Sequence, residues 1–136
     1  MKSLVWIVED AALVRLLIEE ILSENDFIVR SFRSARQAIS SLGEGHAIPS
    51  ILITDISFDG DQTTGWDVAR FVHKVSPDIL TIYISGYFDS DDPVEAIPPG
   101  IFLRKPFTGK QLISAISDAR GKSSPPDRST GTFPIG

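Results

Sequence analysis

Acidic side chains follow two of the most apolar segments of the chain. Glu9 and Asp10 come directly after residues 4–8, and Asp55 follows residues 51–54. If these segments are neighbouring strands of an open parallel sheet, the three carboxylates meet in a crevice beyond its carboxyl edge. Their mutual repulsion is costly unless a cation lies among them. Because oxygen ligands without sulfur favour Mg²⁺, the sequence predicts a magnesium site at this edge.

Two further polar residues follow apolar segments of the same kind. Ser85 comes directly after residues 79–84, and Lys105 lies two positions after residues 101–103. A lysine among carboxylates would pair with them or with an anionic ligand. Lys105 also precedes Pro106, and an X-Pro bond just after a strand is a candidate for cis geometry. Each residue alone fits a surface turn, but the shared position at strand ends predicts one common site.

The segments that must position these residues alternate between strand and helix patterns. Short runs rich in β-branched residues predict buried parallel strands over residues 4–8, 51–54, 79–84 and 101–103, with a more polar edge strand over residues 27–32. Apolar residues with helical spacing lie between these strands and predict the buried faces of helices. The faces are Val14, Leu17, Ile18, Ile21 and Leu22; Ala35, Ala38, Ile39 and Leu42; Val68, Phe71, Val72 and Val75; and Leu112, Ala115, Ile116 and Ala119.

This alternation predicts an α/β fold, a (βα)5 doubly wound five-stranded parallel sheet in one domain over residues 1–120. Only residues 89–97 are free for the fourth helix, and prolines crowd them, so we expect a short or irregular helix there. Residues 121–136 contain 11 Gly, Pro, Ser or Thr residues among 16. This composition predicts a disordered tail.

Composition and charge exclude several classes of function. The 136 residues carry 13 Lys and Arg against 18 Asp and Glu, a net charge of −5 that argues against binding nucleic acid through phosphate contacts. The chain has no cysteine, which excludes thiol catalysis, zinc–thiolate sites and disulfides. No apolar run is long enough to span a membrane, and the N-terminus lacks a signal-peptide pattern. We therefore expect a cytoplasmic protein with no membrane or DNA partner.

The set of strand-end residues resembles the response-regulator receiver domain, the CheY-like family. The motifs that carry the resemblance are Glu9-Asp10, Asp55, Ser85-Gly86 and Lys105-Pro106-Phe107, in consistent order over residues 4–120. The resemblance implies a flavodoxin-like sheet of strand order 2-1-3-4-5. It also implies a two-component phosphorelay protein that signals through an aspartyl phosphate.

The resemblance implies a role for each residue of the set. Asp55 would be the nucleophile that takes a phosphoryl group from a histidine kinase or a histidine phosphotransfer protein. Lys105 would pair with Asp55 and then with the phosphoryl oxygens, and Ser85 would be the switch hydroxyl that moves onto the phosphate. Phe102 lies at the aromatic switch position. Such a domain is not a conventional enzyme, but it would catalyse its own phosphorylation and dephosphorylation.

The same resemblance implies how Mg²⁺ would be held. Asp10 and Asp55 would bind the ion directly, Glu9 through water, and the backbone carbonyl of Ser57 would add a further ligand. The loop from Asp55 to Gly65 is longer and more acidic than is usual in the family and lacks the usual proline. The path of this loop near the metal therefore cannot be carried over from the family.

Two pairs of residues are candidates for tuning this function. Ser57 and Tyr87 lie two positions after Asp55 and Ser85, where side chains overhang the phosphoryl group, so a bulky Tyr87 is expected to lengthen the phosphate lifetime. Leu13 and Leu16 lie off the predicted buried face of the first helix. We expect them to be exposed and to form part of the docking surface for the phosphodonor.

Other interpretations stay open at this point. The chain could be a phosphorylation-independent binding module with a receiver fold. Residues 59–63, Asp-Gly-Asp-Gln-Thr, match a motif of haloacid-dehalogenase-type phosphatases, but the nucleophile of that motif must end a strand and Asp59 lies four residues too late. Residues 55–60 imitate the start of a calcium-binding EF-hand loop, but Trp66 stands at the twelfth position in place of the bidentate Glu, and a strand is predicted where an EF-hand has a helix. We favour a stand-alone phosphorylatable receiver without an output domain after residue 120, which signals to a downstream protein target by contact.

Overall fold

The computed structural model describes residues 2–45, 47–56, 63–86 and 99–121. Its strands are β1 (Leu4–Val8), β2 (Ile28–Phe32), β3 (Ile51–Asp55), β4 (Leu80–Ser85) and β5 (Ile101–Arg104). All neighbouring pairs are parallel, and the order is β2-β1-β3-β4-β5. The predicted fold class and strand order are confirmed, and the more polar strand β2 lies at an edge of the sheet.

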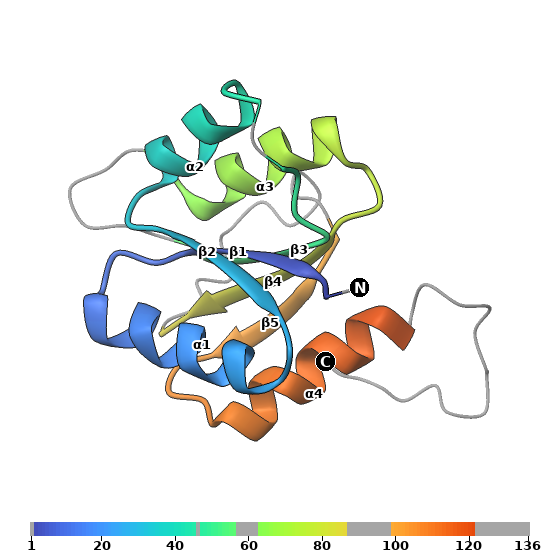
Figure 1. Ribbon diagram of the computed structural model, residues 1–136. Coiled ribbons are helices and arrows are strands. Elements are labelled where there is room, and N and C mark those ends of the chain that lie inside the picture. The colour runs from blue at the N-terminus through green and yellow to red at the C-terminus, as the bar shows by residue number, and fades with distance from the viewer. Residues whose placement is uncertain (1, 46, 57–62, 87–98, 122–136) are drawn as a thin grey trace.

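Helices cover both faces of this sheet. The helices among the described residues are α1 (Ala12–Glu24), α2 (Ala35–Leu42), α3 (Gly65–Val75) and α4 (Gly109–Gly121). Figure 1 shows α2 and α3 on one face and α1 and α4 on the other. The short helix expected over residues 89–97 and most of the tail expected over residues 121–136 lie outside the described residues. None of the described helices combines the length and the apolar character needed to cross a membrane.

The central strands are apolar throughout because both of their faces are buried. In β1, Trp6 and Val8 contribute to the core beneath α2 and α3, whereas Val5 and Ile7 contribute to the core against α1 and α4. All four side chains are completely buried. The carboxyl ends of β1 and β3 therefore lie between two cores, and this packing gives the site a rigid base.

The helix faces differ from the predicted ones at three positions. Leu17, Phe71 and Val75 were predicted to be buried, but they are 48%, 45% and 52% exposed. In α3 the small residues Gly65 and Ala69 are buried beside Val68 and Val72, and this turns the buried face away from Phe71 and Val75. In α1 the fully buried residues are Ile18 and Leu22, and Leu17 lies at the margin of that face.

Side-chain caps fix where two helices begin near the sheet edge that carries the site. The Thr64 hydroxyl accepts a hydrogen bond from the Asp67 N–H at 3.4 Å, and the Asp67 carboxylate accepts one from the Thr64 N–H at 2.8 Å. Thr108 and Gln111 form the same reciprocal pair at the start of α4. Each cap satisfies N–H groups that have no partner within the helix.

Candidate functional site

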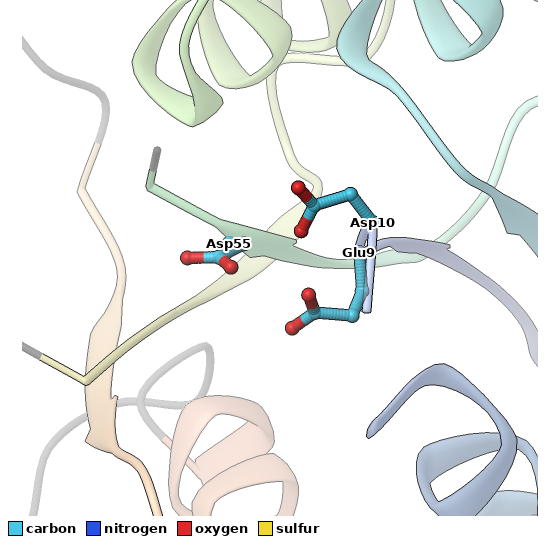
Figure 2. A group of neighbouring side chains, drawn as sticks. All are labelled: Glu9, Asp10 and Asp55. Atoms are coloured by element: carbon cyan, nitrogen blue, oxygen red, sulfur yellow. The ribbon is translucent and has the colours of Figure 1, made fainter. Parts of the chain in front are cut away.

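The carboxyl ends of β1 and β3 bring the three acidic residues together, as predicted. These strands pair directly, with Val8 beside Thr54, so the residues that follow them meet at the sheet edge. Glu9, Asp10 and Asp55 each offer a carboxylate oxygen, and these oxygens lie within 4.8 Å of one another. Figure 2 shows the Glu9 and Asp10 side chains leaving opposite sides of the chain after β1, both extending toward Asp55.

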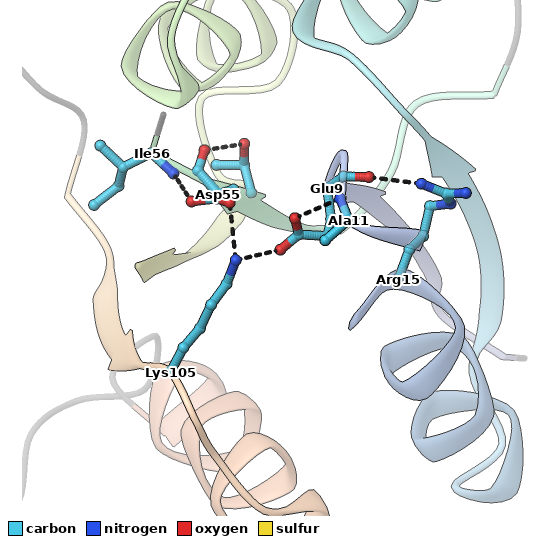
Figure 3. Close-up of polar contacts among 7 residues, drawn as sticks. Glu9, Ala11, Arg15, Asp55, Ile56 and Lys105 are labelled. Carbon is cyan, nitrogen blue, oxygen red and sulfur yellow. Dashed lines mark hydrogen bonds and ion pairs between the residues drawn. The ribbon is translucent and has the colours of Figure 1, made fainter. Parts of the chain in front are cut away.

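Lys105 joins this group from the loop after β5. Its Nζ lies 2.7 Å from Glu9 Oε1 and 2.9 Å from Asp55 Oδ2, so one ammonium group contacts two carboxylates (Figure 3). The Lys105 N–H donates to the Ser85 carbonyl at 2.9 Å, which fixes its backbone beside the end of β4. The Lys105–Pro106 peptide bond is cis, as the sequence suggested.

Burial and the ion pairs act in opposite directions on the pKa values of Glu9 and Lys105. Glu9 is completely buried, and burial raises the pKa of its carboxyl group, with Asp55 adding to the shift against the hydrogen bonds from Lys105 and the Ala11 N–H. For Lys105, burial alone would lower the pKa. Its interactions with Glu9 and Asp55 outweigh burial, and the net pKa lies above the ordinary value. Lys105 is therefore a cation at neutral pH.

Backbone groups hold both carboxylates that face Lys105. Glu9 Oε2 accepts a hydrogen bond from the Ala11 N–H at 3.0 Å, and Asp55 Oδ1 accepts one from the Ile56 N–H at 2.7 Å. The Glu9 carbonyl accepts a bond from Arg15 Nη1 at 2.9 Å. Sequence reasoning missed Arg15, and the available signal was that it is the one basic residue within α1.

Gly65 lies against the backbone of the central acidic residue. A Cβ atom at this position would lie 1.9 Å from the Asp55 carbonyl oxygen, so no other residue type fits without a backbone shift. The Gly65 N–H donates to the Ile56 carbonyl at 2.7 Å and ties the start of α3 to the end of β3. The sequence pointed to Gly65 only as the end of a long loop.

The other predicted residues fall into three groups. Ser85 ends β4, only 4% exposed, and Phe102 is 45% exposed with its ring stacked on Tyr83. Leu13 and Leu16 are 82% and 56% exposed on α1, as predicted. Ser57 and Tyr87, the candidates for metal binding and phosphate lifetime, lie outside the described residues.

The donor set fits a hard divalent cation. It holds three carboxylates and no sulfur or imidazole ligand, which suits Mg²⁺ better than a transition metal. Glu9 and Asp55 are buried, but Asp10 is not, so the group is open to solvent on one side. Lys105 is the cation that the structure shows beside Glu9 and Asp55. An EF-hand is contradicted at Asp55, because this residue ends strand β3, whereas the first residue of an EF-hand loop follows a helix.

Comparisons with known proteins identify the family of the chain. The sequence model of the response regulator receiver domain matches residues 5–117. The chain is 30% identical to the C4-dicarboxylate transport transcriptional regulatory protein DctD of Rhizobium meliloti, over 87% of this chain and 25% of that protein. It is 31% identical to the luminescence regulatory protein LuxO of Vibrio campbellii, over 85% of this chain and 25% of that protein. The chain thus spans about a quarter of the length of these curated relatives.

Solved structures show the same likeness. A response regulator receiver protein from Sinorhizobium medicae is 33% identical, with a TM-score of 0.78 over 87% of this chain and 94% of that one. The chemotaxis protein CheY4 of Vibrio cholerae has a TM-score of 0.77 over 88% of this chain and 99% of that one, but at 17% identity it shows the fold alone. The chain belongs to the response regulator receiver domain family.

Proposed function

We propose that this receiver domain takes a phosphoryl group onto Asp55 from a phosphohistidine of a histidine kinase or a histidine phosphotransfer protein. The observation that carries the proposal is the contact of Lys105 Nζ with Asp55 Oδ2 at 2.9 Å. This contact places a cation beside a carboxylate that a backbone N–H holds at the last residue of the central strand β3. Membership of the receiver family supports the same role.

The reaction is a displacement at phosphorus. A carboxylate oxygen of Asp55 forms the new P–O bond while the P–N bond to the donor imidazole breaks, and the electron pair stays on the imidazole nitrogen. Such transfers depend chiefly on positioning and charge stabilisation. The Ile56 N–H holds the nucleophile, and Lys105 offsets negative charge on the phosphoryl oxygens. Ser85 is proposed as the hydroxyl that hydrogen-bonds the phosphoryl group once it is present.

The acidic group is the proposed site of the metal that this reaction needs. Glu9, Asp10 and Asp55 would hold Mg²⁺, with the Ser57 carbonyl as a further ligand taken from the family resemblance. When bound, Mg²⁺ supplies positive charge that offsets the charge of the phosphoryl oxygens. Glu9 is also hydrogen-bonded to the Ala11 N–H, which keeps its carboxylate aimed at this position before any ion arrives.

Phosphate uptake from a small donor tests the proposal. The full chain is incubated with acetyl phosphate and Mg²⁺, and the covalent phosphate is counted by intact-protein mass spectrometry. The wild type is expected to gain one phosphoryl group, and Asp55→Asn none. Asp78→Asn, which changes an exposed acid on the turn before β4, is the matched control and should behave as the wild type. Uptake by Asp55→Asn would place the phosphoryl group on another residue and contradict the role of Asp55. No uptake by the wild type would favour a phosphorylation-independent binding module.

Leu13 and Leu16 are proposed as part of the surface that meets the phosphodonor protein. They project from the first turns of α1, which begins three residues after Glu9, and both are exposed. Leu16→Asp should slow transfer from a phosphohistidine-carrying protein about 10-fold, roughly what a lost apolar contact in an interface produces. Transfer from acetyl phosphate should stay unchanged, and equal rates from the protein donor would contradict the docking role.

A further inference from the structure

Three aromatic rings from three different elements lie in contact beside the site. Trp66 comes from the first turn of α3, Tyr83 from β4 and Phe102 from β5. The ring centroids of Trp66 and Tyr83 lie 4.8 Å apart, those of Tyr83 and Phe102 lie 5.2 Å apart, and those of Trp66 and Phe102 lie 6.0 Å apart. We call these three rings the aromatic cluster.

The sheet register places one end of the aromatic cluster next to the proposed switch residue. Tyr83 and Phe102 are direct partners across β4 and β5, and their rings stack at 29°. Ser85 follows Tyr83 by two positions, so it lies on the same face of the sheet. Gly100 makes room for this packing, because a Cβ atom there would lie 2.8 Å from Tyr83 Cε2.

The other end of the aromatic cluster is tied to the backbone of the proposed phosphoacceptor. Trp66 directly follows Gly65, whose Cα is packed against the Asp55 carbonyl and whose N–H donates to Ile56. The reciprocal cap between Thr64 and Asp67 holds the same helical turn in place. A movement of the Trp66 ring therefore acts on a turn that is bonded to the end of β3.

Exposure shows which ring can move. Tyr83 is completely buried and Trp66 is 7% exposed, whereas Phe102 is 45% exposed. Phe102 stacks on Tyr83 and meets Trp66 edge-on, and buried rings in close packing do not change position independently of a ring in contact with them. Phe102 has solvent on one side and can change its rotamer, and that change alters the surroundings of both other rings.

We propose that Trp66 is a positioning residue that couples the Phe102 ring to the Asp55–Gly65 backbone through Tyr83. The inference rests on the proposed function, since the coupling is a response to phosphorylation of Asp55. According to this proposal, the start of α3 responds to phosphorylation, and the packing of the three rings transmits the response. The packing of the three rings carries the coupling, and the Tyr83 hydroxyl is not needed for it.

Fluorine NMR of the full chain labelled with 5-fluorotryptophan tests the coupling. The protein has two tryptophans. Trp6 belongs to the same core but packs on Phe32 at 4.8 Å, outside the aromatic cluster, and serves as the comparison. On phosphorylation by acetyl phosphate with Mg²⁺, the Trp66 resonance is expected to move by more than the Trp6 resonance. Phe102→Leu should abolish the Trp66 shift while the chain still takes up phosphate.

A second pair of variants tests whether the aromatic ring of Tyr83 is what transmits the shift. Tyr83→Phe keeps the ring and should preserve the Trp66 shift, whereas Tyr83→Leu should remove it. An unmoved Trp66 resonance in phosphorylated wild type, or an unchanged shift in phosphorylated Phe102→Leu or Tyr83→Leu, overturns the coupling alone. Intact-protein mass spectrometry on the same samples counts the phosphate, so a wild type that takes up none overturns the proposed function together with the coupling.

Discussion

Lys105 contacts two carboxylates that come from different strands, and this contact organises the site at the scale of single residues. Its Nζ lies between Glu9 and Asp55, which are both buried. The raised pKa of Lys105 means that its contribution to stability is complete below its ordinary pKa of 10.5. That contribution is lost only as the pH rises through the folded-state value. At neutral pH the ammonium group therefore stabilises the folded chain fully.

Replacing this lysine leaves buried carboxylates without their cation. Lys105→Met is expected to lower the free energy of unfolding at pH 7 without divalent metal by about 1–3 kcal/mol, measured by urea unfolding. Without the lysine, the pKa of the Glu9 carboxyl group rises further, so the loss should shrink as the pH falls and this carboxylate takes up a proton.

The matched control for this variant is Lys110→Met, which changes an exposed lysine at the start of α4. Its free energy of unfolding should lie within about 0.5 kcal/mol of the wild-type value, both at pH 7 and at lower pH. A Lys105→Met chain as stable as this control at pH 7 would show that the two ion pairs contribute nothing to the fold.

The site residues differ in how far their sequence context reveals them. Glu9, Asp10 and Asp55 could be predicted because a parallel sheet places successive strand ends at one edge. Arg15 could not, because its bond is to a backbone carbonyl and leaves no pattern of side-chain types. The same limit applies to Gly65, whose role depends on the close approach of two backbones.

At the scale of elements, α3 begins where its backbone touches β3. Gly65→Ala should lower the free energy of unfolding by about 1–3 kcal/mol, because its methyl group would overlap the Asp55 carbonyl and push the helix from the strand. The shift also displaces the proposed nucleophile, so phosphate uptake should slow.

Gly43→Ala is the comparison for this change. Gly43 has an ordinary φ of −83°, and the nearest atom to a new Cβ would be 3.7 Å away. Its stability should equal or slightly exceed that of the wild type. If Gly65→Ala unfolded at the same urea concentration as Gly43→Ala, the close approach of α3 to β3 would not be a constraint on the sequence.

The strand and helix positions of the described residues follow from apolar patterning, but the buried helix faces follow only in part. A stripe of apolar residues on a helix predicts its buried side. The stripe of α3 was misplaced toward Phe71 and Val75 because apolar spacing gives no weight to small residues. Gly65 and Ala69 allow close packing there and set which side of the helix faces the sheet.

At the scale of the whole molecule, a partly buried histidine links stability to pH. His73 of α3 lies 3.0 Å from the Thr81 hydroxyl at the start of β4, and burial lowers its pKa below the ordinary 6.5. The unfolded chain therefore binds this proton more readily than the folded one. The contribution of His73 to stability is therefore complete above its unfolded-state pKa, and it is lost as the pH decreases toward its folded-state pKa.

His73→Gln should weaken that dependence. Between about pH 7.5 and pH 5.5, the free energy of unfolding measured in urea should fall by more in the wild type than in the variant. Groups that titrate in both proteins, such as Glu9, cancel in the difference between the two slopes. Identical slopes would show that burial does not hold His73 in its neutral form.

The central claim, that Asp55 accepts the phosphoryl group, concerns one covalent bond and can be tested at that bond. An aspartyl phosphate is an acyl phosphate, and borohydride reduces it to homoserine. The full chain is phosphorylated with acetyl phosphate and Mg²⁺, reduced, digested and sequenced by tandem mass spectrometry. The account predicts homoserine at position 55 and at no other acidic position, and none when Mg²⁺ is removed by chelation. Homoserine at another aspartate, or unmodified Asp55 in a chain that has taken up phosphate, would contradict it.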